Sequence, residues 1–398
     1  MKNILISTYD MEVGGVERSL ITLLDHIDYK KYNVDLMLYR HHGDFLGLIN
    51  KNVNILSEVG EYATFRKSIS QIIKEKMFGV AGSRLLARII TAISANVKQI
   101  EEPGYIQMQL MWKFALPFLP KIEKKYDVAI SYLWPHDFVA EKVYAKKKIA
   151  WIHTDYSTIN THIKMDTKVW RKFDHIIAVS EACKYAFLHK YSEFYDNVSV
   201  IENIVSPEFI RNMSNELIEN SFMSDKSFKI VTVARLSHAK GIDLAVKALN
   251  VIKEKGYENI SWYVVGYGGE ELKIRQLIKE FKLENRFILL GKQTNPYPYI
   301  KHADLYVQPS RYEGKAVTVG EAQILGKPVI ITDYPTAESQ VKNRIDGLIT
   351  ELSEYGIANC IINLYENLEE RYYLMSNCQD IIYNNDEEIK KLYQTING

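Results

Sequence analysis

The sequence has few cysteines and almost no net charge, and each of these features argues against certain kinds of protein. Only three cysteines occur in 398 residues, and they lie far apart without the spacing of a metal-binding motif. An odd, scattered set of thiols is typical of a reducing compartment and argues against a disulfide-stabilised secreted domain. The formal net charge of +1 argues against nucleic acid or any other strongly charged partner.

Long apolar runs are also missing. No stretch approaches the ~20 consecutive apolar residues that a membrane-spanning helix needs. The N-terminal residues MKNILIST are too short and too strand-like for a signal peptide, and they lead directly into a turn. The sequence predicts a cytoplasmic protein and leaves open a peripheral position on the inner face of a membrane.

The composition that is present is that of a globular α/β protein. Hydrophobic residues make up 47% of the chain and charged residues 25%, and 398 residues suffice for two cores. Short apolar runs alternate with helical patterns, which favours parallel sheets with crossover helices. The predicted strands are Asn3–Thr8, Val34–Leu38, Val53–Leu56, Val128–Tyr132, Ile149–Ile152, Ile176–Val179, Val198–Ile201, Lys229–Val233, Trp262–Val265, Phe287–Leu290, Leu305–Val307 and Val329–Ile331. We therefore predict two doubly wound, Rossmann-like domains that face a central cleft.

The domain boundaries follow from composition. Residues 204–227 are polar, contain Pro207 and are rich in Asn, Ser and Glu, as interdomain linkers often are. We expect a first domain at 1–204, with a helical insertion at about 64–125, and a second domain at 205–380.

Residues 64–99 interrupt the alternation of strands and helices. They hold seven basic residues against one acidic residue, Glu75, and their apolar residues recur at roughly helical spacing. A basic amphipathic segment of this kind can lie on an anionic membrane surface. Two helices that cover the first sheet, with their charges in solvent, would show the same pattern, so both interpretations stay open. We assign the nearby Trp112, Phe114 and Phe118 to the core.

The most informative segment is Val307–Val329, which has the pattern of strand, turn, helix and strand. Glu313 follows the first strand, at the carboxyl end where open parallel sheets bind ligands. Glu321 lies eight residues later in the predicted helix and can face the same crevice. Backbone N–H groups around Ala316 and Val317 open that helix and suit an anionic phosphate.

Two cations follow the first strand of the second half. Arg235 and Lys240 flank a turn in VARLSHAKGID that is large enough for a phosphate. Arg can hold a phosphate through two hydrogen bonds, whereas Lys acts as a compact point charge. Fixed cations would stabilise the negative charge that develops on a departing diphosphate.

Two further turns carry residues that suit a nucleotide. Gly266 follows a strand in the sequence GYGGE, and a glycine there permits close approach of a ribose or base. Gly291 and Lys292 follow the next strand, and Tyr297 begins the helix after it, so these residues could frame a pyrimidine ring. Turn formation alone would explain them nearly as well.

The first half has its own candidates. Gly15, in a Gly-Gly pair, opens a helix after the first strand and lets the backbone approach a diphosphate or sugar. His153 and Asp155 follow a buried strand in WIHTDY and should project at the rim of the cleft. The chain has no Asp-x-Asp motif that would hold a metal against a diphosphate, so we expect the cations Arg235 and Lys240 to replace it.

Together these residues resemble the retaining GT-B glycosyltransferases of family 4, the glycosyl transferases group 1. The Glu-x7-Glu signature of that family matches Glu313 and Glu321, and the resemblance is strongest over Lys229–Ile331 but covers nearly the whole chain. It implies an acceptor-binding first domain, a nucleotide-sugar-binding second domain and a C-terminal helix, within residues 381–398, that crosses back to the first domain. WIHTDY resembles a subgroup common in bacterial capsule, exopolysaccharide and cell-wall glycan synthesis.

The resemblance also implies roles for individual residues. Glu313 would contact hydroxyls of the donor sugar, and Glu321 would bind the nucleotide ribose. Arg235 and Lys240 would hold the diphosphate, helped by the backbone amides that open the helix. His153 would lie beside the donor sugar.

Gly15 would lie against donor or acceptor.

The sequence departs from the family pattern at two places. The first carboxylate is followed by Gly-Lys-Ala in place of the usual Gly-Phe/Pro-Gly, so Lys315 adds a cation beside the donor. The usual Asn-Gly-Val of the interdomain junction appears as Asn203-Ile204-Val205, without the glycine.

The expected reaction is transfer of a sugar from a nucleotide-diphosphate sugar, with UDP the commonest nucleotide of the family, to a hydroxyl of a glycan or lipid-linked acceptor. No resident cofactor is expected. No side chain is an obvious covalent nucleophile, which favours a same-face substitution that retains the anomeric configuration. Two alternatives stay open: a nucleotide-sugar 2-epimerase on the same fold, and a non-catalytic nucleotide-sugar-binding partner of a membrane glycan assembly.

Overall fold

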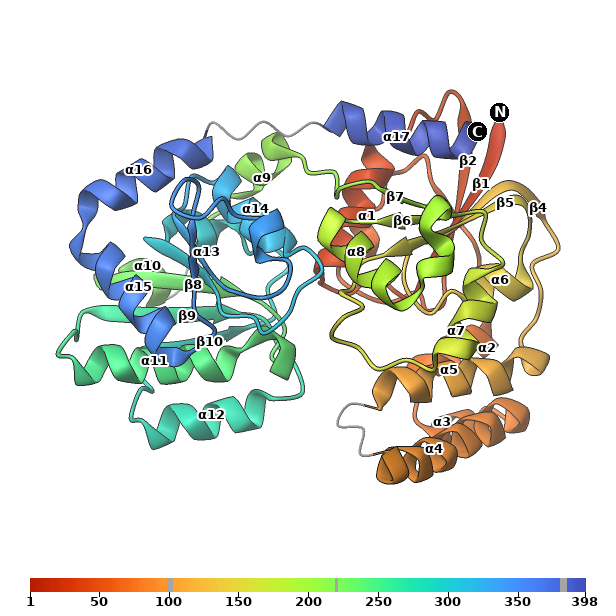
Figure 1. Ribbon diagram of the computed structural model, residues 1–398, viewed down its shortest axis with the longest axis horizontal. Helices are drawn as coiled ribbons and strands as arrows, with labels where there is room; N and C mark the ends of the chain where they lie inside the picture. Colours follow the sequence, from red (N-terminus) through yellow and green to blue (C-terminus); the bar gives the residue numbers. More distant parts are fainter. Residues whose placement is uncertain (99–102, 219–220, 380–384) are drawn as a thin grey trace. The chain divides into compact units, whose positions relative to one another are not determined.

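The computed structural model describes residues 1–98, 103–218, 221–379 and 385–398. The chain divides into two compact units, each with its own parallel sheet (Figure 1). Unit 1 comprises Met1–Ile204 and Asn385–Gly398, and unit 2 comprises Val205–Asn384. Residue 99 at the end of the predicted basic segment, and residues 380–384 around the start of the predicted C-terminal segment, lie outside the described residues.

Unit 1 is built on a seven-stranded sheet in the order β3-β2-β1-β4-β5-β6-β7, with every pair parallel. Ile6 pairs with Leu36 on one side and Ile130 on the other, so apolar side chains continue across the central strands. The strands are β1 Lys2–Thr8, β2 Tyr32–Leu38, β3 Asn54–Ile55, β4 Lys125–Ser131, β5 Tyr144–Ile152, β6 His175–Ala178 and β7 Val198–Val200. Each coincides with a predicted strand.

The helices of unit 1 connect these strands or form the insertion between β3 and β4. They are α1 Gly15–Asp25, α2 Gly60–Ala63, α3 Ile69–Lys74, α4 Phe78–Lys98, α5 Gly104–Ala115, α6 Asp137–Lys142, α7 Ile163–Trp170, α8 Glu181–Lys190 and α17 Asn385–Asn397, with short 3-10 turns η1 Leu46–Leu48, η2 Thr64–Arg66, η3 Leu116–Phe118 and η4 Ser192–Asn197.

The insertion is helical as expected, but one of its aromatic residues is not where the sequence analysis put it. Trp112 on α5 is fully buried and stacks on Phe65 with ring centroids 4.3 Å apart. Phe118 is instead 53% exposed, because η3 turns it out of the core and against the start of α4. The assignment of Phe118 to the core was wrong.

The C-terminal helix α17 packs on unit 1. Leu392 and Ile396 belong to the unit 1 core, and the Tyr393 ring stacks on Tyr32 at 5.1 Å. The Tyr393 hydroxyl accepts a hydrogen bond from the Asp28 backbone N–H at 2.7 Å. The last described residues of the chain therefore complete the unit that its first residues begin.

Unit 2 is built on a six-stranded parallel sheet in the order β10-β9-β8-β11-β12-β13. Its strands are β8 Phe228–Val233, β9 Ile260–Val265, β10 Phe287–Gly291, β11 Leu305–Gln308, β12 Val329–Thr332 and β13 Leu348–Thr350. Successive side chains of a strand point to opposite faces of the sheet, so each face has its own apolar cluster. Ile230 packs into one cluster, and its neighbour Val231 packs into the other. The sequence analysis missed β13, which has only three residues and no alternating pattern.

The helices of unit 2 cover both faces of this sheet (Figure 1). They are α9 Pro207–Met213, α10 Ser221–Ser224, α11 Ile242–Glu254, α12 Glu271–Glu280, α13 Tyr297–His302, α14 Val317–Ile324, α15 Glu354–Glu366 and α16 Leu368–Gln379, with 3-10 turns η5 His238–Lys240 and η6 Ala337–Ser339. The segment 204–227 is more than a linker, because α9 and α10 bury Ile210 and Phe222 in unit 2. Its polar composition reflects the exposed faces of these two short helices.

Candidate functional site

The loop that follows β11 holds Glu313 in a network of hydrogen bonds. Gln308 Nε2 donates to Glu313 Oε1 at 3.1 Å, and the Ser310 hydroxyl donates to the same oxygen at 2.7 Å. Tyr306 in turn donates from its hydroxyl to Gln308 Oε1 at 2.7 Å. Glu313 is only 6% exposed, and these neutral donors compensate the burial of its charge.

The second oxygen of this carboxylate meets Lys240. The Lys240 Nζ lies 2.5 Å from Glu313 Oε2. Lys240 and Glu313 are 73 residues apart in the sequence, but they form an ion pair because they follow β8 and β11, which are neighbours in the sheet. The structure brings together two of the predicted site residues of unit 2.

A glycine permits this approach of the two loops. Gly241 has φ of +63°, and a Cβ there would lie 1.8 Å from the Pro309 carbonyl oxygen. Any side chain would therefore push the Lys240 turn away from the loop of Glu313. Arg311 clamps the same junction, since its two terminal nitrogens donate to the two carboxylate oxygens of Asp243 at 2.7 Å each.

Arg235 lies at the opening of the same loop, after β8. Its side chain is exposed, and within the described part of the chain its guanidinium makes no hydrogen bond or ion pair. Close backbone packing fixes the chain on either side of it. A Cβ on Gly266 would lie 1.9 Å from the Ala234 oxygen, and one on Gly268 would lie 2.4 Å from the Leu236 oxygen. The backbone on either side of Arg235 is therefore closely packed, while the Arg235 side chain is exposed.

Glu321 lies in α14 and is 1% exposed. The Tyr297 hydroxyl donates to its Oε1 at 3.0 Å, which joins two residues that the sequence analysis proposed separately. Both Glu313 and Glu321 act electrostatically on Tyr306, and burial together with these two carboxylates raises the pKa of that phenol above its usual value. The two acids of the Glu-x7-Glu pair therefore lie around one tyrosine.

The start of α14 is held by a side chain from a distant loop. Gln340 Oε1 accepts from the Ala316 N–H at 3.1 Å, and Gln340 Nε2 donates to the Ala316 carbonyl. Tyr334 donates to the same Gln340 oxygen at 2.8 Å. The first turn of the helix, beginning at Val317, is thereby fixed beside the Lys240–Glu313 pair.

The remaining predicted residues of unit 2 lie on the neighbouring strands. Gly291 ends β10 with φ of +71°, and its carbonyl accepts from the Gly266 N–H at 2.8 Å. The Lys292 ammonium lies 5.3 Å from the centre of the Tyr267 ring. The loops after β8, β9, β10 and β11 therefore supply these residues at one edge of the sheet.

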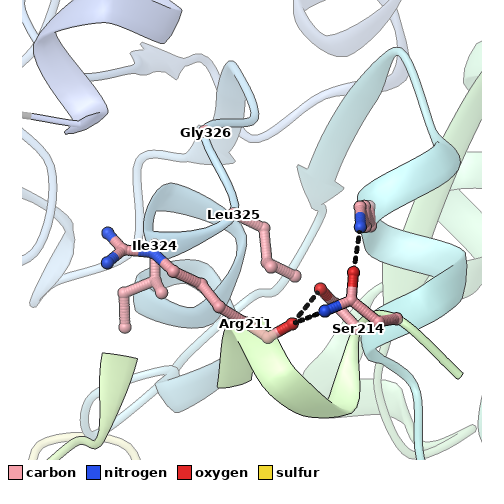
Figure 2. Close-up of a pocket in the computed structure, with 7 residues that line it drawn as sticks. Arg211, Ser214, Ile324, Leu325 and Gly326 are labelled. Atoms are coloured by element: carbon pink, nitrogen blue, oxygen red, sulfur yellow. Dashed lines mark hydrogen bonds between the residues drawn. The ribbon is translucent and has the colours of Figure 1, made fainter. Parts of the chain in front are cut away.

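A hollow of about 430 Å³ in unit 2 contains none of the predicted residues. Figure 2 shows its lining from α9, α13 and the end of α14, with Arg211, Ser214, Ile324, Leu325 and Gly326 labelled. It lies at the carboxyl end of α14, the end that carries the negative pole of the helix dipole. A site for a phosphate is better placed at the opposite end, near Val317.

His153 and Gly15 belong to unit 1. Gly15 begins α1 as predicted, after an extended Gly14. His153 follows β5, its ring lies 4.6 Å from that of Tyr132, and its buried Nε2 has no hydrogen-bond partner among the described residues. Burial lowers the pKa of His153 to about 3, so the ring is neutral near pH 7.

Asp155 differs from its expected position. The carboxylate is buried and accepts from the Ser157 N–H at 2.8 Å and the Ser157 hydroxyl at 2.7 Å. It therefore closes its own turn and does not project at a rim. The prediction for Asp155 was wrong because an acid two residues before a serine readily forms such a local turn.

The sequence analysis missed several residues that hold the site. Gln308 and Ser310 were read only as the end of a strand, although a buried Gln next to a Ser and a Glu is itself a signal of a hydrogen-bonded cluster. Arg311 and Asp243 carried no motif at all. In unit 1, buried Asp10 follows β1 and has an oxygen without a hydrogen-bond partner among the described atoms.

The comparisons with known proteins concern the sequence family and the fold. Residues 213–385, which include every predicted site residue of unit 2, match the family model described as Glycosyl transferases group 1. The part of the chain that contains unit 2 is therefore similar to the glycosyl transferases group 1. Among the described residues, no helix is long and apolar enough to cross a membrane, and no group of three His, Cys, Asp or Glu side chains is placed to hold a metal ion.

Two relatives are similar to this chain in sequence over part of their length. MJ1059 of Methanocaldococcus jannaschii, named an uncharacterized glycosyltransferase, is 29% identical over 170 residues, 42% of this chain and 42% of that protein. The poly(ribitol-phosphate) alpha-N-acetylglucosaminyltransferase of Staphylococcus aureus is 26% identical over 199 residues, 49% of this chain and 38% of that protein. The chain therefore matches about two fifths of the length of each.

Two solved structures resemble the chain over its whole length. Anabaena HepE in complex with UDP and glucose has a TM-score of 0.69 at 18% identity, and the match covers 100% of this chain and 99% of HepE. A TarM mutant of S. aureus in complex with fondaparinux, alpha-GlcNAc-glycerol and UDP has a TM-score of 0.69 at 16% identity and full coverage of both. At these identities the likeness shows the fold, and it confirms the predicted GT-B class.

Proposed function

We propose that this group 1 glycosyltransferase chain transfers a sugar from a UDP-sugar to a hydroxyl acceptor with retention of configuration, as in family 4. The observation that carries the proposal is the Lys240–Glu313 pair beside the first turn of α14. A diphosphate needs cations and backbone donors, and a sugar needs a carboxylate acceptor for its hydroxyls. The geometry of unit 2 supplies all three at one sheet edge.

Lys240 has the position to serve both parts of the donor. Its ammonium has three N–H donors, and Glu313 Oε2 takes one of them, so others remain for a phosphate oxygen. Arg235 adds a second cation and the Val317 N–H adds a backbone donor, whereas the Ala316 N–H already donates to Gln340 Oε1. These fixed charges would stabilise the diphosphate as it departs, without a metal ion.

The proposed step is a same-face substitution. The bond between the anomeric carbon and the departing phosphate oxygen breaks, and the acceptor oxygen bonds to the same face of that carbon. The acceptor proton passes to the departing phosphate oxygen, so UDP leaves and no protein nucleophile is consumed. Glu313 would stabilise the positive charge that builds on the sugar ring.

The remaining residues would orient the donor. Glu321, held by Tyr297, would bind the ribose hydroxyls, and the loops at Gly266, Gly291 and Lys292 would frame the base. His153, whose neutral ring has a free Nε2, and Gly15 would contact the donor sugar or the acceptor, as the resemblance to the family implies.

We further propose a role in bacterial surface glycan, capsule or cell-wall polymer synthesis, with the protein in the cytoplasm and in peripheral contact with the membrane. Relatives named for amylovoran biosynthesis in Erwinia amylovora and O-antigen biosynthesis in Escherichia coli support this setting. Their substrates would be glycans or lipid-linked saccharides.

The test is an assay of UDP release from a panel of UDP-sugars, with and without a pool of glycan and lipid-linked acceptors. Release that depends on an acceptor, with the anomeric configuration of the donor kept in the product by NMR, supports the proposal. Isomerised sugar in the absence of acceptor would favour the 2-epimerase. Binding of UDP-sugar without turnover on any acceptor would favour the non-catalytic partner.

A further inference from the structure

Helix α4 carries its large apolar side chains on the outside. Five of them are between 45% and 65% exposed, and we call them the apolar stripe: Phe78, Leu85, Leu86, Ile89 and Ile93. At 100° per residue they fall within one sector about 100° wide, the width that a globular helix normally turns toward a core. Here that sector faces away from the protein.

The orientation of α4 is fixed by its other face. The inner face holds mainly small or polar residues: Ala87 belongs to the unit 1 core, Ile90 packs against that core, and Val80 and Ala81 pack with Ile72 of α3. The Ser83 hydroxyl donates to the Phe114 carbonyl of α5 at 2.9 Å. A rotation that buried the stripe would remove these contacts and bring five large side chains against the protein.

Apolar side chains from neighbouring elements extend the stripe. Ile73 on α3 is 47% exposed, and Phe118 of η3 lies directly against the backbone of Gly79. Figure 1 shows α3 and α4 side by side at one end of unit 1, with α5 between α4 and the sheet. The exposed apolar surface therefore belongs to a continuous group of elements and not to one misplaced residue.

Among the described residues, the charges beside the stripe are mostly positive. Lys74, Lys76 and Arg88 are exposed and, within the described part of the chain, form no ion pair. The nearest acid, Glu75, is paired with Lys67 at 2.7 Å. The sequence has no Asp or Glu from Lys76 to Ile100. A surface with cations around an apolar stripe complements anionic headgroups above acyl chains.

A second copy of this chain fits the charges poorly. Pairing two stripes face to face would bring the Lys and Arg residues of both copies together without acids to neutralise them. A bilayer with anionic lipids satisfies the apolar side chains and the cations at once. We propose that α4 lies in the interface of an anionic membrane, with the apolar stripe in the acyl region and Lys74, Lys76 and Arg88 among the headgroups.

This inference deepens the membrane setting of the proposed function by naming the surface, the segment and the lipid charge. It brings the protein to membrane-bound acceptors. Vesicle binding requires no donor sugar, so it can fail while glycosyl transfer stands, and transfer can fail while binding stands.

The experiment is co-sedimentation of the full chain with vesicles of phosphatidylcholine alone or with 30% phosphatidylglycerol. Leu85→Gln/Ile89→Gln should lower the affinity for the mixed vesicles at least tenfold, and Lys74→Glu/Arg88→Glu should lower it similarly and flatten its salt dependence. The matched control is Leu272→Gln on α12, an apolar residue that is 78% exposed in unit 2, which should change nothing.

The circular dichroism spectrum and thermal melting of each variant establish that it is folded, which is expected because the replaced side chains are exposed. Equal binding to neutral and anionic vesicles, or wild-type binding by the Leu85→Gln/Ile89→Gln variant, would overturn the inference. So would a wild-type dimer in light scattering that this variant converts to a monomer, because the stripe would then cover itself.

Discussion

Arg311 and Asp243 form a bidentate ion pair, with two N–H···O contacts of 2.7 Å, between the loop that carries Glu313 and the first turn of α11. Arg311 also donates to the carbonyl of His238 at 2.8 Å, two residues before Lys240 in the same short turn. Neither residue faces the Lys240–Glu313 contact, but together they set the distance between the loops that carry it.

This pair should act on catalysis through position. Arg311→Lys keeps the positive charge but cannot donate from two nitrogens to both oxygens of Asp243. We expect it to lower kcat about tenfold with a smaller change in KM. Asp243→Asn should do the same, and the double variant should be no worse than either single one, since both remove one interaction. Arg275→Ala, which breaks the exposed Arg275–Glu271 pair, is the control and should leave kcat unchanged. Additive losses in kcat would argue against the shared role.

Removal of the Lys240 ammonium tests the proposed diphosphate site. Lys240→Ala should lower kcat by about two to three orders of magnitude, because the cation stabilises charge that develops only as the phosphate departs. Lys273→Ala on α12, a lysine with its own exposed ion pair, is the matched control and should keep full turnover. Wild-type kcat in Lys240→Ala, with a verified donor, would show that the site is elsewhere.

Glu321 should govern nucleotide affinity rather than turnover. Glu321→Ala removes a charged hydrogen-bond acceptor worth about 1.5–3 kcal/mol, so the Kd for UDP should rise roughly ten- to a hundredfold by calorimetry. Tyr297→Phe removes only the hydroxyl that orients this carboxylate and should give a smaller rise. An unchanged Kd in both variants would contradict the assignment to ribose.

The close approach at Gly241 can be tested by adding one methyl group. Gly241→Ala would place a Cβ 1.8 Å from the Pro309 oxygen at a positive φ, and we expect it to destabilise unit 2 by about 2–4 kcal/mol. Gly269→Ala in a nearby loop meets nothing within 4 Å and should change the free energy of unfolding by less than about 0.5 kcal/mol. Urea denaturation of both variants distinguishes a steric requirement at Gly241 from a general sensitivity of these loops.

Buried His136 should make unit 1 sensitive to acid. Burial lowers the pKa of His136 from 6.5 to about 3. The imidazole therefore binds a proton below pH 6.5 in the unfolded chain, but only below about pH 3 in the folded chain. The stabilisation by neutral His136 is complete above pH 6.5 and is lost as pH falls through this window. The cost of His136→Gln in free energy of unfolding should therefore be about 2 kcal/mol smaller at pH 5 than at pH 7.

Comparison with the variant is needed because Asp137 acts in the opposite direction. Burial and the nearby Asp166 raise its pKa to about 7, so its contribution to stability is lost as pH rises through the range above 3.8. Urea denaturation of wild type and His136→Gln at both pH values cancels this background. The same energy difference at pH 5 and pH 7 would mean that His136 is protonated in the folded state.

The sequence by itself determined the elements and the candidate residues of the second unit. Short apolar runs predicted twelve strands, because a strand that is covered by helices on both faces must be apolar along most of its length. The Glu-x7-Glu spacing and the strand–turn–helix context around Arg235 and Lys240 each lie within a short segment of the chain. Such local patterns can be recognised from the amino-acid sequence alone.

Only the tertiary structure decided which of these residues meet. The Lys240–Glu313 contact and the Arg311–Asp243 pair join positions that are adjacent only because β11 lies beside β8. The outward direction of the apolar stripe on α4 could not be predicted from the sequence either. The same periodicity occurs in a helix whose apolar side points inward and in one whose apolar side points outward. Pattern fixes which side chains share a face, whereas packing against neighbouring elements decides where that face points.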